Sequence, residues 1–182
     1  LAFPYVAAKS LNSSFTQVSF SGLGLIRNWG GNQAHHDLAY YYDRAGGVFD
    51  QNINYQDTYP DLIVIEVGTN DFSTDPQPHE PWHNIEEVQQ AWVDEMVSFV
   101  SQLRVRYPKR PIVLMPRPAY PYDLIIPSTE QAIDRLEQQG ESNLYTQTFT
   151  SELNGCIWHP TAQEHQQIAN TLVEFIQQHR LL

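Results

Sequence analysis

Two polar segments follow apolar runs of the sequence, where amide and main-chain groups could act on a substrate. Gly68-Thr69-Asn70-Asp71 comes directly after the most apolar run of the chain, so the Asn70 amide is a candidate hydrogen-bond donor beyond a buried strand. Ser21-Gly22 follows an earlier β-rich run, and the Gly22 main-chain N–H is a second candidate donor. Each segment is also typical of a plain turn, because Gly, Asn, Asp and Ser favour turns on conformational grounds alone.

A histidine near the C-terminus is the candidate general base. His159 is followed by Pro160 where the last helix is predicted to begin, and this placement holds the residue in one orientation, as a general base requires. A single histidine is also commonly structural, so His159 alone does not define a site. The six other histidines are assigned no chemistry, and no cluster of three or four ligands predicts a metal site.

The elements that must position these residues alternate between strands and helices. Strands are predicted over residues 15–20, 61–67, 111–115 and 144–149. Helices are predicted over residues 3–11, 85–103 and 128–139, and from Thr161 onward. Gly140 is placed to end the third helix, and Thr161 with Glu164 has the spacing of a capping box. This alternation predicts an α/β fold with a mostly parallel sheet in three layers, whose active residues follow the carboxyl ends of strands.

Composition sets the limits on class and partners. The 182 residues suffice for one domain with a substantial core. Ten basic and 21 acidic residues give a formal net charge of −11, which repels nucleic acid and anionic lipid but is compatible with a neutral substrate. The longest strongly apolar run, residues 62–65, is far too short to span a membrane. Cys156 is the only cysteine, so no disulfide can form within the chain.

In this order along the chain, the polar segments resemble the conserved blocks of the SGNH hydrolases, also called GDSL esterases. Gly68, Asn70 and Asp71 match the third block of that family, Gly22 matches the second, and His159 matches the fifth. The resemblance spans nearly the whole chain and implies the flavodoxin-like SGNH fold. It further implies a serine esterase that needs no metal or organic cofactor.

Three segments, two of which contain Gly22 and His159, are most similar to carbohydrate esterase family two. They are the opening Phe3-Pro4-Tyr5, the segment Ser21 to Leu25, and the ending Cys156 to Pro160. This family comprises acetyl esterases that act on plant polysaccharides, usually with a β-sandwich domain before the catalytic one. The resemblance therefore implies a secreted or periplasmic protein that acts on a small-molecule or polysaccharide ester.

One departure from the family concerns the nucleophile. The Gly-Asp-Ser block that holds the serine is absent from the chain, and we expect it upstream of Leu1. The first strand of the fold is expected there too, between the strands predicted at residues 15–20 and 61–67. Residues 1–182 are then an esterase domain that lacks its N-terminal strand and nucleophile block.

A second departure lies three residues before the histidine. The wider family has an aspartate there, whereas this chain has Cys156, and a thiol cannot orient an imidazolium as a carboxylate does. Members of family two resemble this sequence in that respect, because main-chain carbonyls hold their histidine. Nothing marks Cys156 as an activated thiolate, so it is a poor candidate nucleophile.

These observations predict a short-chain or acetyl carbohydrate esterase with a Ser–His dyad. His159 would act as the base, and the Gly22 N–H and the Asn70 amide would stabilise the oxyanion, each donor contributing about 3 kcal/mol. Trp158 and Trp29 are candidate walls for a sugar ring, although each is equally a packed aromatic residue. The alternatives are a non-catalytic carbohydrate-binding remnant of such an esterase and a structural domain with ordinary turns, against which the order of the blocks argues.

Overall fold

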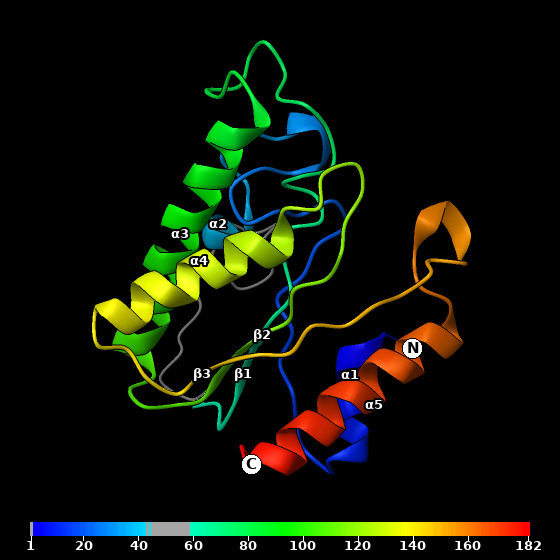
Figure 1. Cartoon of the computed structure of the whole chain (residues 1–182). Coiled ribbons are helices and arrows are strands. Elements are labelled where there is room, and N and C mark those ends of the chain that lie inside the picture. Colours follow the sequence, from blue (N-terminus) through cyan, green and yellow to red (C-terminus); the bar gives the residue numbers. More distant parts are fainter. Residues whose placement is uncertain (1, 43, 45–58) are drawn as a thin grey trace. The chain divides into compact units, whose positions relative to one another are not determined.

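In the computed structural model, which describes residues 2–42, 44 and 59–182, three short apolar runs form a parallel sheet (Figure 1). β1 (Ile63–Ile65), β2 (Ile112–Leu114) and β3 (Leu144–Thr146) pair in the order β1-β2-β3. All three residues of β2 are buried, as is typical of a parallel strand covered on both faces. The strands predicted over residues 61–67, 111–115 and 144–149 are confirmed, each shorter than the run that predicted it.

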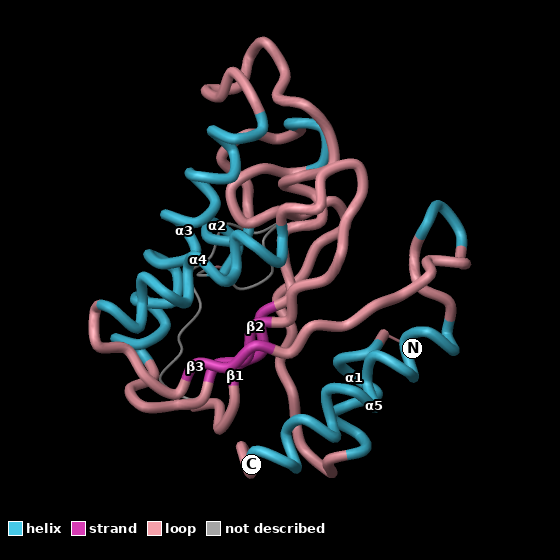
Figure 2. The backbone as a smooth tube through the Cα atoms, in the orientation of Figure 1, coloured by secondary structure: helices cyan, strands magenta, loops and turns pink. Residues whose placement is uncertain are grey.

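The register of the sheet brings the carboxyl ends of its strands to one edge. Ile63 lies opposite Ile112, and Ile112 lies opposite Leu144. Figure 2 shows the three strands side by side and the long loops that connect them to the helices. The Gly68–Asp71 segment follows β1 at the carboxyl edge, where open α/β sheets bind their ligands.

Helix α3 (Ile85–Arg106) shares the core with the sheet and packs on α4 (Ile125–Gln138). It begins after Asn84, whose side chain accepts the Glu87 N–H at 2.8 Å, and it ends before Pro108 as predicted. Its buried face consists of Ile85, Val88, Trp92, Val93, Met96, Phe99, Val100 and Leu103. This face is the predicted apolar stripe, and its burial supplies much of the core of this part of the chain.

Helix α4 (Ile125–Gln138) begins earlier than its predicted start at Ser128. The early start is possible because Pro127 falls in the first turn, where main-chain N–H groups have no partner within the helix. The hydroxyl of Ser128 donates to the Leu124 carbonyl, so this polar side chain can be buried. Gly140, with φ of 88°, follows the end of the helix as predicted.

The elements fall into two units. The larger, Val18–Thr146, holds the sheet, α3, α4, the short helix α2 (Leu38–Tyr42) and the single turn η1 (Trp29–Gly31). The smaller combines Leu1–Gln17 with Gln147–Leu182.

Two helices build the smaller unit. α1 (Phe3–Ser10) has Pro4 in its first turn, as predicted, and packs on α5 (Ala162–His179). The predicted capping box is present at the start of α5, where the Thr161 side chain accepts the Glu164 N–H and the Glu164 side chain accepts the Thr161 N–H. The short turn η3 (Cys156–Trp158) lies in the loop before this helix.

The prediction of a strand over residues 15–20 is wrong. This segment has no regular secondary structure, and its aromatic residues are exposed, Phe15 by 45% and Phe20 by 55%. A strand is stabilised by its ladder with a neighbour, and no strand of the described residues pairs with this segment. High β-propensity therefore did not suffice here.

The α/β class and the parallel sheet are confirmed, and they agree with an SGNH (GDSL-like) hydrolase fold. The three-layer arrangement stays a prediction. Among the described helices, none combines the length and apolar character that a membrane crossing requires.

Candidate active site

The turn that follows β1 requires glycine at its first position. Gly68 has φ of 125°, which side-chain-bearing residues rarely adopt, and a Cβ there would lie 3.1 Å from the Ile125 side chain. The Phe72 N–H donates to the Gly68 carbonyl at 3.2 Å and closes the turn. Asn70 and Asp71 are thereby brought to the carboxyl end of β1, as the sequence predicted.

The Asp71 side chain is fully buried and organises the neighbouring loop. Its carboxylate accepts the main-chain N–H groups of Leu25, Ile26 and Arg27 at 3.0, 2.9 and 3.0 Å. Burial raises the pKa of Asp71 to about 6, although the three N–H donors act in the opposite direction. The group is therefore ionised at neutral pH, in the form that accepts all three bonds.

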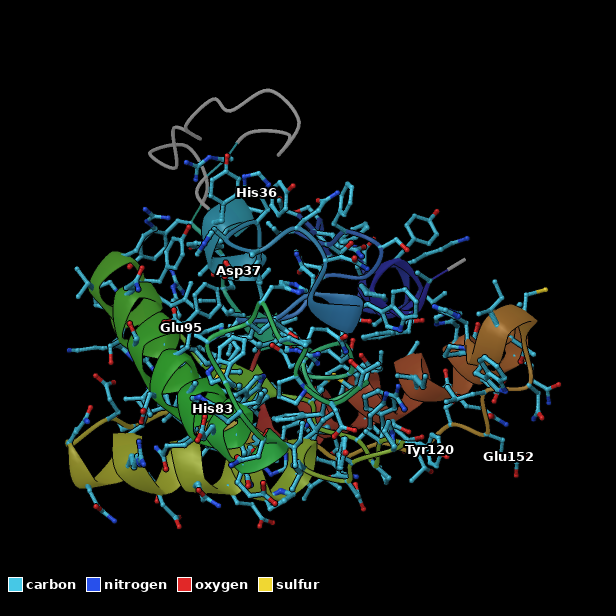
Figure 3. The ribbon with its side chains drawn as sticks, turned by 90° about the horizontal axis from the view of Figure 1, so that it is seen from above. His36, Asp37, His83, Glu95, Tyr120 and Glu152 are labelled. Carbon is cyan, nitrogen blue, oxygen red and sulfur yellow. The ribbon has the colours of Figure 1, made fainter. Side chains whose placement is uncertain are left out.

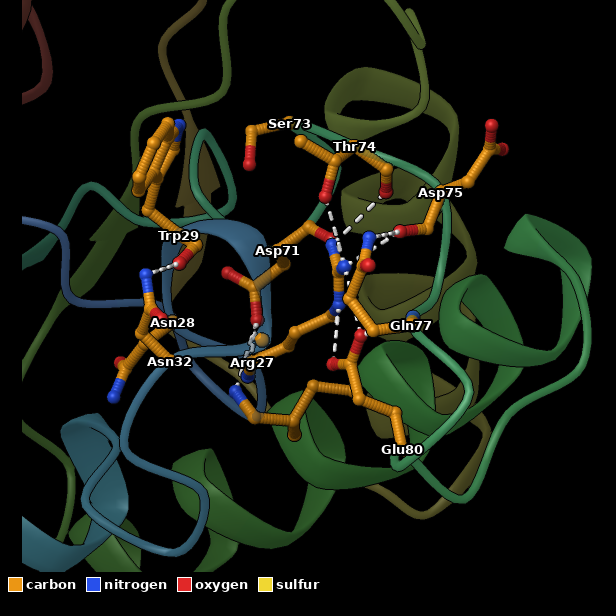
Figure 4. Close-up of polar contacts among 12 residues, drawn as sticks. Arg27, Asn28, Trp29, Asn32, Asp71, Ser73, Thr74, Asp75, Gln77 and Glu80 are labelled. Atoms are coloured by element: carbon orange, nitrogen blue, oxygen red, sulfur yellow. Dashed lines mark hydrogen bonds and ion pairs between the residues drawn. The ribbon is translucent and has the colours of Figure 1, made fainter.

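The Arg27 side chain also joins the loop after β1 to the loop that contains Gly22 (Figure 4). Its guanidinium, in a residue only 2% exposed, forms a two-point ion pair with the Glu80 carboxylate at 2.6 and 2.9 Å. It also donates to the main-chain carbonyls of Asp71, Thr74 and Asp75 at 3.1, 3.0 and 2.8 Å. The charge is thus fully compensated, and the loop after β1 is fixed to the loop that contains Gly22.

The two predicted donors lie on these joined loops. The Asn70 Nδ2 donates to the Leu23 carbonyl at 2.8 Å, which places the amide beside Gly22 and leaves its second N–H for another acceptor. Gly22 has φ of 81°, and its N–H has no hydrogen-bond acceptor among residues 2–42, 44 and 59–182. The arrangement can therefore offer two N–H groups to a developing oxyanion.

Trp29 lies directly beside this pair. Its main-chain N–H donates to the Gly22 carbonyl at 2.9 Å, and the residue is 57% exposed. An exposed indole next to two hydrogen-bond donors can stack on the face of a sugar ring. Its role as a sugar wall stays a prediction.

His159 lies in the smaller unit, in the loop that precedes α5. Its Nδ1 lies 2.7 Å from the Ile157 carbonyl oxygen. A carbonyl can only accept, so Nδ1 carries the hydrogen and the Nε2 lone pair is left to accept a proton. A main-chain carbonyl thus accepts the Nδ1 hydrogen bond, as the resemblance to family two implies.

The carbonyl reaches the ring through an uncommon backbone conformation. Ile157 has φ of 53° and ψ of 47°, in the left-handed region that β-branched residues avoid. The next residue, Trp158, is also left-handed and is 81% exposed. Strained residues of this kind gather at functional sites, where the surroundings hold them.

The nearest upstream carboxylate is not bonded to the imidazole. Glu152 is exposed on this loop (Figure 3) and accepts the Asn154 side-chain N–H at 3.2 Å. Cys156 is exposed and free. In the described part of the chain, the Ile157 carbonyl is the hydrogen-bond partner found for the His159 ring.

The structure thus brings Gly22, Asn70 and Trp29 together in the larger unit and places His159 and Trp158 in the smaller one. Sequence reasoning missed Arg27 and Glu80, which contact across 53 positions and carry no motif that links them. It also missed the left-handed Ile157. Among the described residues, no group of three or more His, Cys, Asp or Glu is placed to hold a metal ion.

Comparison with known proteins gives relatives and folds but no matching family model. The chain is 29% identical over 179 residues to an acetylxylan esterase/glucomannan deacetylase of Cellvibrio japonicus. This match covers 98% of this chain and 49% of that protein. A solved carbohydrate esterase, described as having an active site with divergent catalytic and non-catalytic binding functions, superposes with a TM-score of 0.92 at 29% identity. That match covers 97% of this chain and 54% of the other.

Two further structures support the fold alone. A family two carbohydrate esterase from Clostridium thermocellum, solved with cellohexaose, gives a TM-score of 0.82 at 23% identity over 99% of this chain and 55% of that one. A GDSL-like lipase from Bacteroides ovatus gives 0.58 at 18% identity over 97% and 78%.

The fold agrees with that of the SGNH (GDSL-like) hydrolases. The predicted resemblance to carbohydrate esterase family two is confirmed. The chain spans about half the length of the relatives given above from that family.

Proposed function

We propose that the protein is a serine esterase that removes acetyl or other short acyl groups from carbohydrate esters. The observation that carries the proposal is the 2.7 Å hydrogen bond between His159 Nδ1 and the Ile157 carbonyl, because it leaves Nε2 as a base. The nucleophilic serine would come from a segment upstream of Leu1, together with the first strand of the sheet.

In the first half of the reaction, the serine oxygen attacks the ester carbonyl while His159 Nε2 takes the serine proton. The oxyanion that forms accepts hydrogen bonds from the Gly22 N–H, from the free N–H of Asn70 and from the N–H of the serine itself. The intermediate collapses to an acyl-enzyme, and the imidazolium returns its proton to the departing sugar hydroxyl. Water then attacks the acyl-enzyme by the same steps, so acid and free serine are regenerated.

The relatives and the exposed aromatic residues support this substrate class. The Cellvibrio japonicus relative is named an acetylxylan esterase/glucomannan deacetylase, and the Clostridium thermocellum enzyme binds cellohexaose. Trp158 and Trp29 offer exposed rings for a neutral sugar, whereas a net charge of −11 disfavours anionic polymers. A polysaccharide substrate agrees with a secreted or periplasmic protein.

The test is acetyl release by the intact protein, including the segment before Leu1, from acetylated xylan, acetylated glucomannan and an aryl acetate. We expect release that His159→Ala abolishes without loss of the thermal unfolding transition. Folded wild-type protein that releases no acetyl group from any of the three would overturn the proposal.

A second candidate is a non-catalytic carbohydrate-binding function. The solved esterase at 29% identity is described as having both catalytic and non-catalytic binding functions, which favours this alternative over others. Calorimetric titration with cello- and manno-oligosaccharides separates the two, because binding without acetyl release identifies the second function.

A further inference from the structure

The loop that carries His159 returns at both ends to one carboxylate, that of Glu164. Upstream of the histidine, the Ser151 hydroxyl donates to Glu164 Oε1 at 3.0 Å, and the Asn154 N–H donates to Oε2 at 3.3 Å. Downstream, the Thr161 N–H donates to Oε2 at 2.7 Å. The carboxylate therefore closes residues 151–161 into a ring of hydrogen bonds.

Glu164 is more than the acidic half of a capping box. The capping box accounts for its contacts with Thr161, whereas those with Ser151 and Asn154 span 13 and 10 positions and do nothing for the helix end. The residue is 8% exposed, although the tip of the loop it holds is open to solvent. The Thr161 N–H and the other donors hold the pKa of Glu164 at about 2, so it is a carboxylate at any working pH.

Within this closed loop, the chain holds a conformation that it would not adopt alone. Leu153, Ile157 and Trp158 all have left-handed φ values, between 53° and 59°. The Gly155 N–H donates to the His159 carbonyl at 2.8 Å, and a Cβ on Gly155 would lie 2.6 Å from that oxygen. Strained residues persist only where the surrounding structure fixes them, and fixed loop ends supply that condition.

We infer that Glu164 is a positioning residue for His159: by holding both ends of the loop, it keeps the Ile157 carbonyl on Nδ1 and so selects the tautomer with a free Nε2. The inference rests on the proposed role of His159 as the base. The acidic group that supports the histidine then acts through the backbone rather than on the ring. It lies five positions after His159, on the first turn of α5.

The tautomer of His159 gives a readout that helix stability alone does not move. We would label the histidines of the intact protein with ¹⁵N, assign His159 with a His159→Gln variant, and record spectra of the neutral imidazole. Wild-type protein should show the Nδ1–H form of His159. Glu164→Gln should shift His159 toward the Nε2–H form and lower kcat at least tenfold, with KM changed less than threefold.

Three matched variants make the experiment decisive. Glu174→Gln removes an exposed carboxylate from the same helix and should change neither readout. Thr161→Ala removes the helix cap but keeps the Glu164 carboxylate and its upstream contacts, so it should lower the unfolding temperature and keep the Nδ1–H tautomer. Ser151→Ala removes one upstream contact and should shift the tautomer partly, and it decides the question if Glu164→Gln does not fold.

An unchanged His159 tautomer in folded Glu164→Gln, or in Ser151→Ala where the former does not fold, overturns the inference. An equal tautomer shift in Thr161→Ala overturns it too, because the effect would then belong to the helix cap. A shift confined to Glu164 and Ser151 variants, in a protein that releases no acetyl group, upholds the inference and overturns the proposed function instead.

Discussion

Asp71 and Arg27 are joined by two hydrogen bonds that run in opposite directions, although 44 positions separate the residues. The Arg27 N–H donates to the Asp71 carboxylate at 3.0 Å, and the Arg27 guanidinium donates to the Asp71 carbonyl at 3.1 Å. Each residue thus uses its side chain on the main chain of the other. Because Gly22 and Asn70 lie on the two loops joined in this way, the pair fixes the distance between the proposed oxyanion donors.

Asp71→Asn should destabilise the protein. The amide keeps one acceptor oxygen, but its NH2 group then faces a main-chain N–H that the second carboxylate oxygen had accepted. One buried donor left without an acceptor costs about 1–3 kcal/mol. Denaturant unfolding at pH 7 measures this cost, and a variant as stable as wild type would contradict the role given to Asp71.

Comparison of the wild type with Asp71→Asn also tests the pKa of Asp71. Burial raises this pKa from 3.8 to about 6, so between these values the folded state binds more protons than the unfolded state. Stability from Asp71 is then fully present below about pH 4 and is lost as the pH rises through about 6, by about 3 kcal/mol in all. The stability difference between wild type and Asp71→Asn should therefore shrink from pH 4 to pH 7. A difference that grows over this range would mean that the three N–H donors outweigh burial.

Asn70→Ala should lower turnover by roughly a hundredfold or more with a much smaller effect on KM, because an oxyanion donor acts chiefly in the transition state. Steady-state kinetics of the intact protein on an aryl acetate measures both. Asn70 also donates to the Leu23 carbonyl, so the unfolding temperature must be recorded alongside. If Asn70→Ala keeps most of its turnover, or merely unfolds, Asn70 is a turn residue and not an oxyanion donor.

We expect a strand from upstream of Leu1 to pair with β1, at the edge of the sheet away from β2. β1 ends the order of the described strands, and Val64 at its centre is 37% exposed although the run around it is apolar. Each buried main-chain group without a partner costs about 1–3 kcal/mol. Hydrogen exchange in the intact protein should show slow exchange for the main-chain N–H groups of Ile63–Ile65, including those that do not face β2. An experimental structure in which β1 pairs directly with residues 15–20 would refute this.

Local signals explain what the sequence could predict. The helices over 85–106 and 162–179 carry an apolar stripe and a cap within a few residues of each other, so neighbouring positions suffice to define them. The turn at Gly68 likewise follows from one buried strand and the residues after it. Both candidate donors were found for this reason.

Contacts between distant residues explain what the sequence could not predict. Residues 15–20 have the composition of a strand, but strand formation depends on a partner that local sequence does not reveal. The Arg27–Glu80 ion pair joins two loops without a repeat or motif. Ile157 is the sharpest case, because its β-branched side chain argues against the left-handed conformation that the fold imposes.

The proposed catalysis uses a Ser–His pair without a carboxylate on the imidazole. Ile157 O accepts from His159 Nδ1 at 2.7 Å, a neutral partner that fixes the tautomer without adding charge. Cys156 occupies the position of the usual aspartate but is exposed, and Glu152 is bonded to Asn154 instead. His159→Ala should therefore abolish turnover, whereas Cys156→Ala and Glu152→Gln should each keep most of it.

Acetyl-release kinetics on the intact protein, with unfolding temperatures as the control for folding, measures all three variants. The pair is a triad if an experimental structure places a carboxylate, from Asp71, Glu152 or another residue, within hydrogen-bond distance of His159 Nδ1 and its removal cripples the enzyme. In that case the carbonyl of Ile157 is not what orients the base, and the left-handed conformation of that residue needs another explanation.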